Sequence, residues 1–159
     1  MYIVVCNDVF DDVPSLITIG QAETATEAKK MATKFIKDIF DNNASDIYFE
    51  WEELLDDDDN VFSLEDVLGH NYYVSVLEVN KDTYVPIVLR GLEEGFPTIE
   101  DICDKKEFKN KEEVIATIKE IEENPDDYMF DYLDVDYDNL RISNEDGDVN
   151  EEIVFLHII

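Results

Sequence analysis

The sequence predicts an α+β fold, in which an antiparallel sheet of about six strands packs with two main amphipathic helices and acid-rich connections. Short apolar runs bounded by turn residues are typical of strands, and two longer segments repeat apolar residues at helical spacing. Although 41 of the 159 residues are Asp or Glu, 45% of the chain is hydrophobic, including nine Phe and eight Tyr. Disordered acidic tails lack such residues, so a folded core is expected.

The N-terminal segment predicts a hairpin followed by a helix. Strands are expected over Tyr2–Cys6 and Ser15–Gly20, around a turn-rich stretch. Thr24 and Glu27 have the spacing of a capping box, and apolar residues then recur at helical spacing up to about Phe40. The outer face of this helix carries Lys29, Lys30, Lys34 and Lys37. The helix is therefore the least acidic part of the chain.

The middle of the chain is acidic and contains a second expected hairpin. Residues 42–80 hold eleven acids and no Lys or Arg. Within them, residues 47–55 fit a helix face and a strand alternation equally, and both interpretations stay open. Tyr72–Val79 and Thr83–Leu89 predict paired strands that turn at Asn80-Lys81-Asp82.

The C-terminal part predicts a helix and a last pair of strands. A single helical turn is expected at Thr98–Asp101, and a longer helix is capped by Asn110 and ends before Pro125. Residues 120–138 hold nine acids and no base, interleaved with aromatic residues. Leu140–Ser143 and Ile153–Ile159 are expected to pair.

The order of these elements suggests one compact domain over residues 1–159. Two strands and a helix occur twice, each time before an acidic stretch, which suggests two related lobes of about 1–70 and 71–159. No repeat of individual residues accompanies this order.

Signals for catalysis are weak. His70 and His157 are the only imidazoles, and neither lies in a local catalytic signature. With five glycines, a phosphate-binding loop is not expected, and carboxylate pairs arise by chance among 41 acids. Cys6 and Cys103 are far apart and form no CxxC pair. We expect neither an enzyme nor a bound cofactor.

One stretch partly resembles an EF-hand calcium loop. Asp134, Asp136, Asp138 and Glu145 have the spacing of ligands in that loop. Asn139 stands where the loop requires glycine, and a strand over Leu140–Ser143 competes with the loop. We therefore expect a solvated acidic turn and keep a calcium-binding module as the third alternative for the function.

The charge limits the partners. Neither a signal peptide nor a transmembrane segment is recognisable, so a cytoplasmic location is expected. A formal charge of −29 repels anionic membranes and nucleic acid. The expected partners are basic protein surfaces.

In size, charge and its two acid-rich stretches, the chain resembles the DNA-mimic inhibitors that phages and mobile elements use against CRISPR or restriction systems. The resemblance implies a stoichiometric inhibitor, often a homodimer, whose carboxylates replace phosphates in the basic site of a nuclease or CRISPR effector. The same features are similar to acidic immunity proteins that neutralise nuclease toxins, which is the second alternative. The expected partner contacts are Glu50, Glu52, Glu53, Asp56, Asp57, Asp58, Asp59, Asp126, Asp127, Asp131, Asp134, Asp136 and Asp138.

Overall fold

The computed structural model describes residues 1–42, 61–65, 69–91, 95–128, 133–146 and 149–159. In these residues the chain is α+β with antiparallel strands, as predicted. The strands form two sheets of four and five strands, so the expectation of one sheet with about six strands is wrong.

The first unit is a four-stranded sheet in the order β2-β1-β4-β3, with helix α1 on one face. Its elements are β1 (Tyr2–Val9), β2 (Leu16–Ala22), α1 (Ala25–Asn42), β3 (Val61–Glu65) and β4 (Asn71–Glu78). The predicted capping box forms: the Thr24 hydroxyl accepts a hydrogen bond from the Glu27 N–H at 3.2 Å, and the Glu27 carboxylate accepts one from the Thr24 N–H at 3.3 Å.

The second unit is a five-stranded sheet in the order β6-β5-β9-β8-β7, with helix α3 on one face. Its elements are β5 (Thr83–Arg90), β6 (Thr98–Ile99), α3 (Lys111–Glu123), the short 3-10 helix η1 (Pro125–Tyr128), β7 (Leu133–Asp136), β8 (Arg141–Asp146) and β9 (Val149–Ile158). The predicted pairing of the last two strands is confirmed by the β8–β9 ladder.

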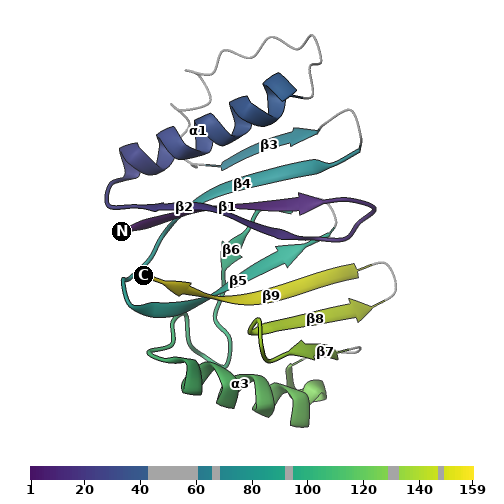
Figure 1. Cartoon of the computed structure of the whole chain (residues 1–159). Coiled ribbons are helices and arrows are strands. Elements are labelled where there is room, and N and C mark those ends of the chain that lie inside the picture. Colours follow the sequence, from purple (N-terminus) through teal and green to yellow (C-terminus); the bar gives the residue numbers. More distant parts are fainter. Residues whose placement is uncertain (43–60, 66–68, 92–94, 129–132, 147–148) are drawn as a thin grey trace.

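The two units stack sheet against sheet, which gives four layers with a helix on each outside (Figure 1). Ala28 and Ala32 are fully buried on α1, and these small side chains let the helix lie close to its sheet. On the other side, Ile118 of α3 packs with Phe108 and Phe155. The core therefore has three parts, one between the sheets and one under each helix.

The second unit repeats the construction of the first. In each, two strands, a helix and two more strands follow one another, and the first and last strands pair at the centre. Strand β7 is an addition at the edge of the second sheet. The chain passes from one sheet to the other between Glu78 and Thr83, a few residues after the lobe boundary expected near residue 70.

The pattern of inward and outward residues also repeats. Val5 of β1 and Ile87 of β5 both face the core between the sheets, whereas Cys6 and Val88, one residue later, face the helix of their own unit. This alternation is what period-two strand geometry requires when both faces of a sheet are covered. It aligns β1 with β5 residue by residue.

Polar contacts at one end of the stack join the units. The buried Asn7 side chain donates hydrogen bonds to the carbonyl oxygens of Arg90 at 2.9 Å and Gly95 at 2.8 Å. It also accepts one from the Ser15 N–H at 3.2 Å. Gly91 is needed nearby, because a Cβ there would lie 1.8 Å from the Asp12 carbonyl oxygen.

Two local predictions are wrong. β4 and β5 do not pair, since each lies in a different sheet, beside β1 and β9 respectively. The turn at Asn80-Lys81-Asp82 carries the chain between the sheets, and the long buried partner strands decide the pairing. Thr98–Ile99 form the short strand β6 and not a helical turn, because Ile99 packs against the core between the sheets.

Among the described residues, no helix is both long enough and apolar enough to cross a membrane.

Candidate partner-binding surface

Helix α3 presents a first group of acids. Asn110 caps its N-terminus by accepting a hydrogen bond from the Glu113 N–H at 2.9 Å, and the helix ends at Asn124, before Pro125. Its buried side turns toward the second sheet through Val114, Thr117, Ile118 and Ile121. The carboxylates of Glu120, Glu122 and Glu123 lie on the other side and are exposed.

The short helix η1 adds Asp126 and Asp127, both exposed. Tyr128 fastens this segment to its neighbours. A hydrogen bond with the Cys103 thiol, together with loss of solvation and the adjacent Glu120 carboxylate, raises the pKa of Tyr128. The two aspartates are therefore held beside the end of α3.

The β7–β8 hairpin supplies the third group. The Asp136 carboxylate accepts hydrogen bonds from the backbone N–H groups of Asp138 at 3.0 Å and Asn139 at 3.1 Å, and from the Asn139 side chain at 2.7 Å. These bonds, led by those from Asn139, lower the pKa of Asp136. Asp136 thus stays ionised and shapes the turn, whereas Asp134 and Asp138 are exposed.

Tyr137 joins the hairpin to α3. Loss of solvation raises the pKa of Tyr137, and so do the charges of Glu122 and Glu123. Figure 1 shows the C-terminal end of α3 beside β7. The three groups come from neighbouring elements at one end of the second unit, and we call these eight acids the α3–β7 acidic patch: Glu120, Glu122, Glu123, Asp126, Asp127, Asp134, Asp136 and Asp138. Asp134 and Asp136 point away from α3, because Leu133 and Val135, which alternate with them in β7, pack under that helix.

The structure places some of the expected contacts and not others. Asp126, Asp127, Asp134, Asp136 and Asp138 lie on neighbouring elements, η1 and the β7–β8 hairpin, with Asp134 and Asp136 on the sheet face opposite α3. Asp131 lies outside the described residues, as do all the expected contacts of the first acidic stretch: Glu50, Glu52, Glu53, Asp56, Asp57, Asp58 and Asp59. Sequence reasoning did not list the helix acids Glu120, Glu122 and Glu123 as contacts. The signal was present, because they alternate with the apolar stripe of α3.

The stretch that partly resembles a calcium loop adopts a different shape. Asp134 and Asp136 belong to strand β7, and the stretch from Arg141 belongs to β8. In the part of the chain that the structure describes, no group of three His, Cys, Asp or Glu side chains could hold a metal ion. The Asp136 carboxylate is already engaged by the turn.

The histidines and cysteines have structural surroundings. His70 Nδ1 lies 2.7 Å from Asp8 Oδ1, and its ring stacks on Phe10. His157 stacks on Tyr84 with ring centres 4.5 Å apart. Burial, followed by the charge of Asp8, raises the pKa of the Cys6 thiol to about 12. This thiol therefore stays protonated, and a protonated thiol is a poor nucleophile.

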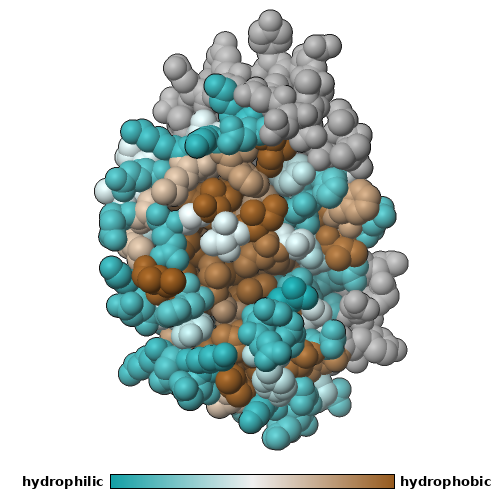
Figure 2. Space-filling view, in the orientation of Figure 1, coloured by the Kyte–Doolittle hydropathy of each residue, from teal (hydrophilic) through white to brown (hydrophobic). Residues whose placement is uncertain are grey.

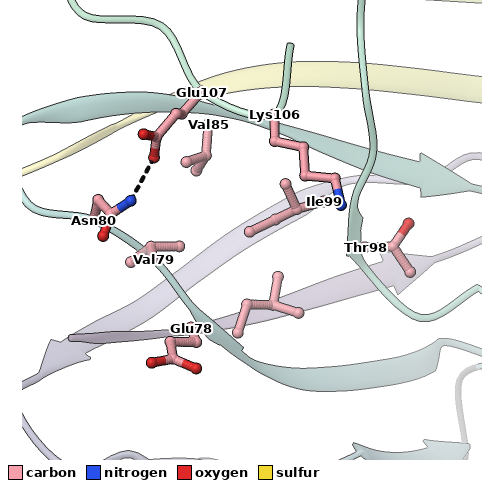
Figure 3. Close-up of a pocket in the computed structure, with 9 residues that line it drawn as sticks. Glu78, Val79, Asn80, Val85, Thr98, Ile99, Lys106 and Glu107 are labelled. Carbon is pink, nitrogen blue, oxygen red and sulfur yellow. Dashed lines mark hydrogen bonds between the residues drawn. The ribbon is translucent and has the colours of Figure 1, made fainter. Parts of the chain in front are cut away.

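A hollow of about 620 Å³ opens beside β6 and the end of β4 (Figure 3). Leu77, Val85 and Ile99 give it an aliphatic lining, and the Lys106 amine extends over it near Ile99. At one end the Asn80 side chain donates a hydrogen bond to the Glu107 carboxylate at 2.8 Å. Polar and charged side chains, among them Glu78, Thr98 and Lys106, make up the rest of the lining, and the hollow shares no residue with the α3–β7 acidic patch.

Comparison with known proteins adds no relative: no protein-family model, curated protein or solved structure matches this chain.

Proposed function

We propose that this protein is an acidic nucleic-acid mimic. It inhibits a nucleic-acid-binding defence enzyme, such as a CRISPR effector or a restriction enzyme, by occupying the enzyme's basic nucleic-acid site. In this proposal it acts in the cytoplasm as a stoichiometric binding protein, without a cofactor and without catalysis.

The observation that supports the proposal is the α3–β7 acidic patch. Its carboxylates come from α3, η1 and the β7–β8 hairpin, and Tyr128 and Tyr137 pack against the same core cluster as Ile118 of α3. The sequence places no Lys or Arg between Glu120 and Asp138. Carboxylates on fixed elements lose little conformational freedom on binding. Less of the favourable free energy of their contacts with a basic partner is therefore offset by the loss of entropy.

The amount of charge suits a nucleic-acid site. Duplex DNA carries one charge per about 1.7 Å, so a charge of −29 corresponds to roughly 50 Å of duplex. An exposed ion pair contributes only about 0 to 1 kcal/mol and is weakened by salt. The proposal therefore requires many small contacts and predicts binding that is lost at high salt.

The first experiment identifies the partner. The purified protein is used as bait in a bacterial lysate at low and at high salt, and retained proteins are identified by mass spectrometry. A nuclease or CRISPR effector that elutes with salt or with competing duplex DNA supports the proposal. A single toxin-like nuclease that DNA does not displace supports the immunity-protein alternative instead.

The second experiment tests the patch with a matched pair of variants. The patch variant combines Asp126→Asn, Asp127→Asn, Asp134→Asn and Asp138→Asn, which leaves the turn-forming Asp136 intact. The control combines Asp11→Asn, Asp12→Asn, Asp82→Asn and Asp101→Asn, all exposed positions outside the patch. Three of these four have positive φ, which Asn tolerates.

Both variants lose the same charge, so only the location differs. The patch variant should bind the captured enzyme roughly tenfold to a thousandfold more weakly. The control should retain most of its affinity. Equal affinities in the two variants would show that the patch is not the contact surface.

A further inference from the structure

Strand β2 is an edge strand without the usual protection. It is the outer strand of the first sheet, and in the described ranges no strand pairs with its free side. Edge strands normally carry charged residues or proline, which discourage pairing with another chain. The β2 sequence, LITIGQA, contains neither, although 33% of the whole chain is charged.

The same part of the chain is electrically neutral. Residues 16–42, which form β2 and α1, contain four acids and four lysines. The whole formal charge of −29 therefore lies in the rest of the chain. Because α1 packs against β2, these residues form one continuous region of the molecule.

The hydropathy of the molecular surface agrees with a neutral region at β2 and α1. Figure 2 shows hydrophobic residues gathered at mid-height, at the level where Figure 1 draws β2, with hydrophilic residues above and below. Leu16, Ile17 and Ile19 of β2 are only partly buried, and Met31 of α1 is exposed beside Gly20. An uncharged strand edge and a partly apolar surface thus adjoin each other.

We propose that two copies of this protein associate through β2, with the two strands antiparallel, so that the four-stranded sheets become continuous. The distribution of charge indicates that the partner at β2 is a second copy of the chain. Two polyanions can approach only through neutral surfaces, whereas a basic partner is drawn to the acidic regions. In such a dimer the acids of α3 and η1 stay on the outer layers, away from the interface.

The salt dependence of this dimer is opposite to that of the inhibitor complex. The interface itself is neutral, but the remaining charges of the two copies repel each other. Raising salt from about 0.1 M to about 1 M shortens the Debye length from about 10 Å to about 3 Å and weakens that repulsion. The dimer should therefore become tighter with salt, while binding to a basic enzyme becomes weaker.

The test combines analytical ultracentrifugation with a charge placed in β2. Thr18 is exposed and lies in the middle of the strand, opposite Val5 of β1. Thr18→Lys adds one charge per copy to the interface, and like charges across paired strands are destabilising. Ala116→Lys adds the same charge at an exposed position of α3 and is the control. We expect loss of the dimer in the first variant and retention in the second.

Other results overturn the proposal: a monomer at every protein and salt concentration, a dimer that Thr18→Lys leaves intact, or a dimer that weakens as salt is raised. If Thr18→Lys misfolds, hydrogen exchange of the wild-type chain tests the β2 dimer instead. The amide groups of β2 should exchange more slowly as protein concentration rises, and unchanged exchange would also overturn it. None of these measurements uses the captured enzyme, so they stand apart from the proposed inhibition.

Discussion

The first and second units differ most in what their helices present to solvent. In the first unit, α1 carries four lysines and belongs to a neutral segment, whereas in the second unit α3 contributes to the acidic patch. The inward-facing positions are much more alike: Val5 in β1 and Ile87 in β5 occupy the same place in the core between the sheets. The inward positions therefore define this fold, and the outward positions are free to carry different charges.

At two buried positions the first unit has a polar residue where the second unit has an apolar one. Asn7 of β1 corresponds to Leu89 of β5, two residues after the aligned pair Val5 and Ile87. Ser75 of β4 pairs with Val5, and its counterpart Val154 of β9 pairs with Ile87. These differences allow the two units to be tested against each other.

The largest effect is expected in the core of the second unit. Phe108 is fully buried and packs edge to face on Phe155, with ring centres 5.4 Å apart. Phe108→Ala should lower the free energy of unfolding by about 3 to 5 kcal/mol, measured by chemical denaturation. Because the sheets share one core, both units should unfold in the same transition, as hydrogen exchange in each would report.

A matched change at the surface checks that the loss comes from burial. Phe10 is 45% exposed and stacks on His70. Phe10→Ala should therefore cost about 1 kcal/mol or less. If Phe108→Ala unfolded the second unit while the first stayed protected, the two units would be independent and the shared core would not couple them.

The next largest loss of stability is expected when the polar residue Asn7 of the first unit is replaced by leucine, the residue at the corresponding position of the second unit. Asn7→Leu removes the partner of two carbonyl oxygens and of the Ser15 N–H. Since leaving one buried polar group unpaired costs about 1 to 3 kcal/mol, a loss of roughly 2 to 4 kcal/mol is expected in denaturant melts.

Asn150→Ala provides the comparison for Asn7. The Asn150 side chain donates a single exposed hydrogen bond to the Asp12 carbonyl oxygen at 3.0 Å, so its loss should cost about 1 kcal/mol or less. Equal losses in the two variants would mean that burial does not make the Asn7 hydrogen bonds more important than an exposed one between the units.

A smaller effect of opposite sign is expected at Ser75. Its hydroxyl is buried and has no hydrogen-bond partner among the described residues. Ser75→Ala should raise the free energy of unfolding by about 1 kcal/mol, because a buried unpaired hydroxyl is unfavourable. Thr117 is the control, since its hydroxyl donates to the Glu113 carbonyl oxygen at 3.0 Å. Thr117→Val should destabilise, and stabilisation in both variants would contradict the explanation.

Sequence reasoning located the helices because their signals are local. Thr24 with Glu27 and Asn110 with Glu113 form caps within a few residues, and the hydrogen bonds are found as expected. The pairing of β4 and β5 could not be obtained in this way. A tight turn looks the same whether it joins two strands of one sheet or carries the chain to another sheet.

The candidate site shows the same limit. The count of acids identified the stretch from Glu120 to Asp138, but not how its parts meet. Tyr137 of the hairpin packs against the core cluster that includes Ile118 and Ile121 of α3, and no sequence spacing encodes this contact. The partial resemblance to a calcium loop came from spacing alone, whereas the strands β7 and β8 result from pairing with the rest of the sheet.

The smallest expected effect distinguishes Asp136, which shapes the turn, from the other acids of the patch. The pKa of Asp136 is lowered below its ordinary value of 3.8, so its ionisation stabilises the fold above that pH and the stabilisation is lost as pH falls. Asp136→Ala should lower the melting temperature at neutral pH, and its difference from wild type should shrink in acid. Asp138 gives this turn only a backbone N–H, so Asp138→Ala should show no such pH-dependent difference. If both variants had the same pH profile, the turn would not depend on the Asp136 carboxylate, and all the patch acids of the hairpin would be available to a partner.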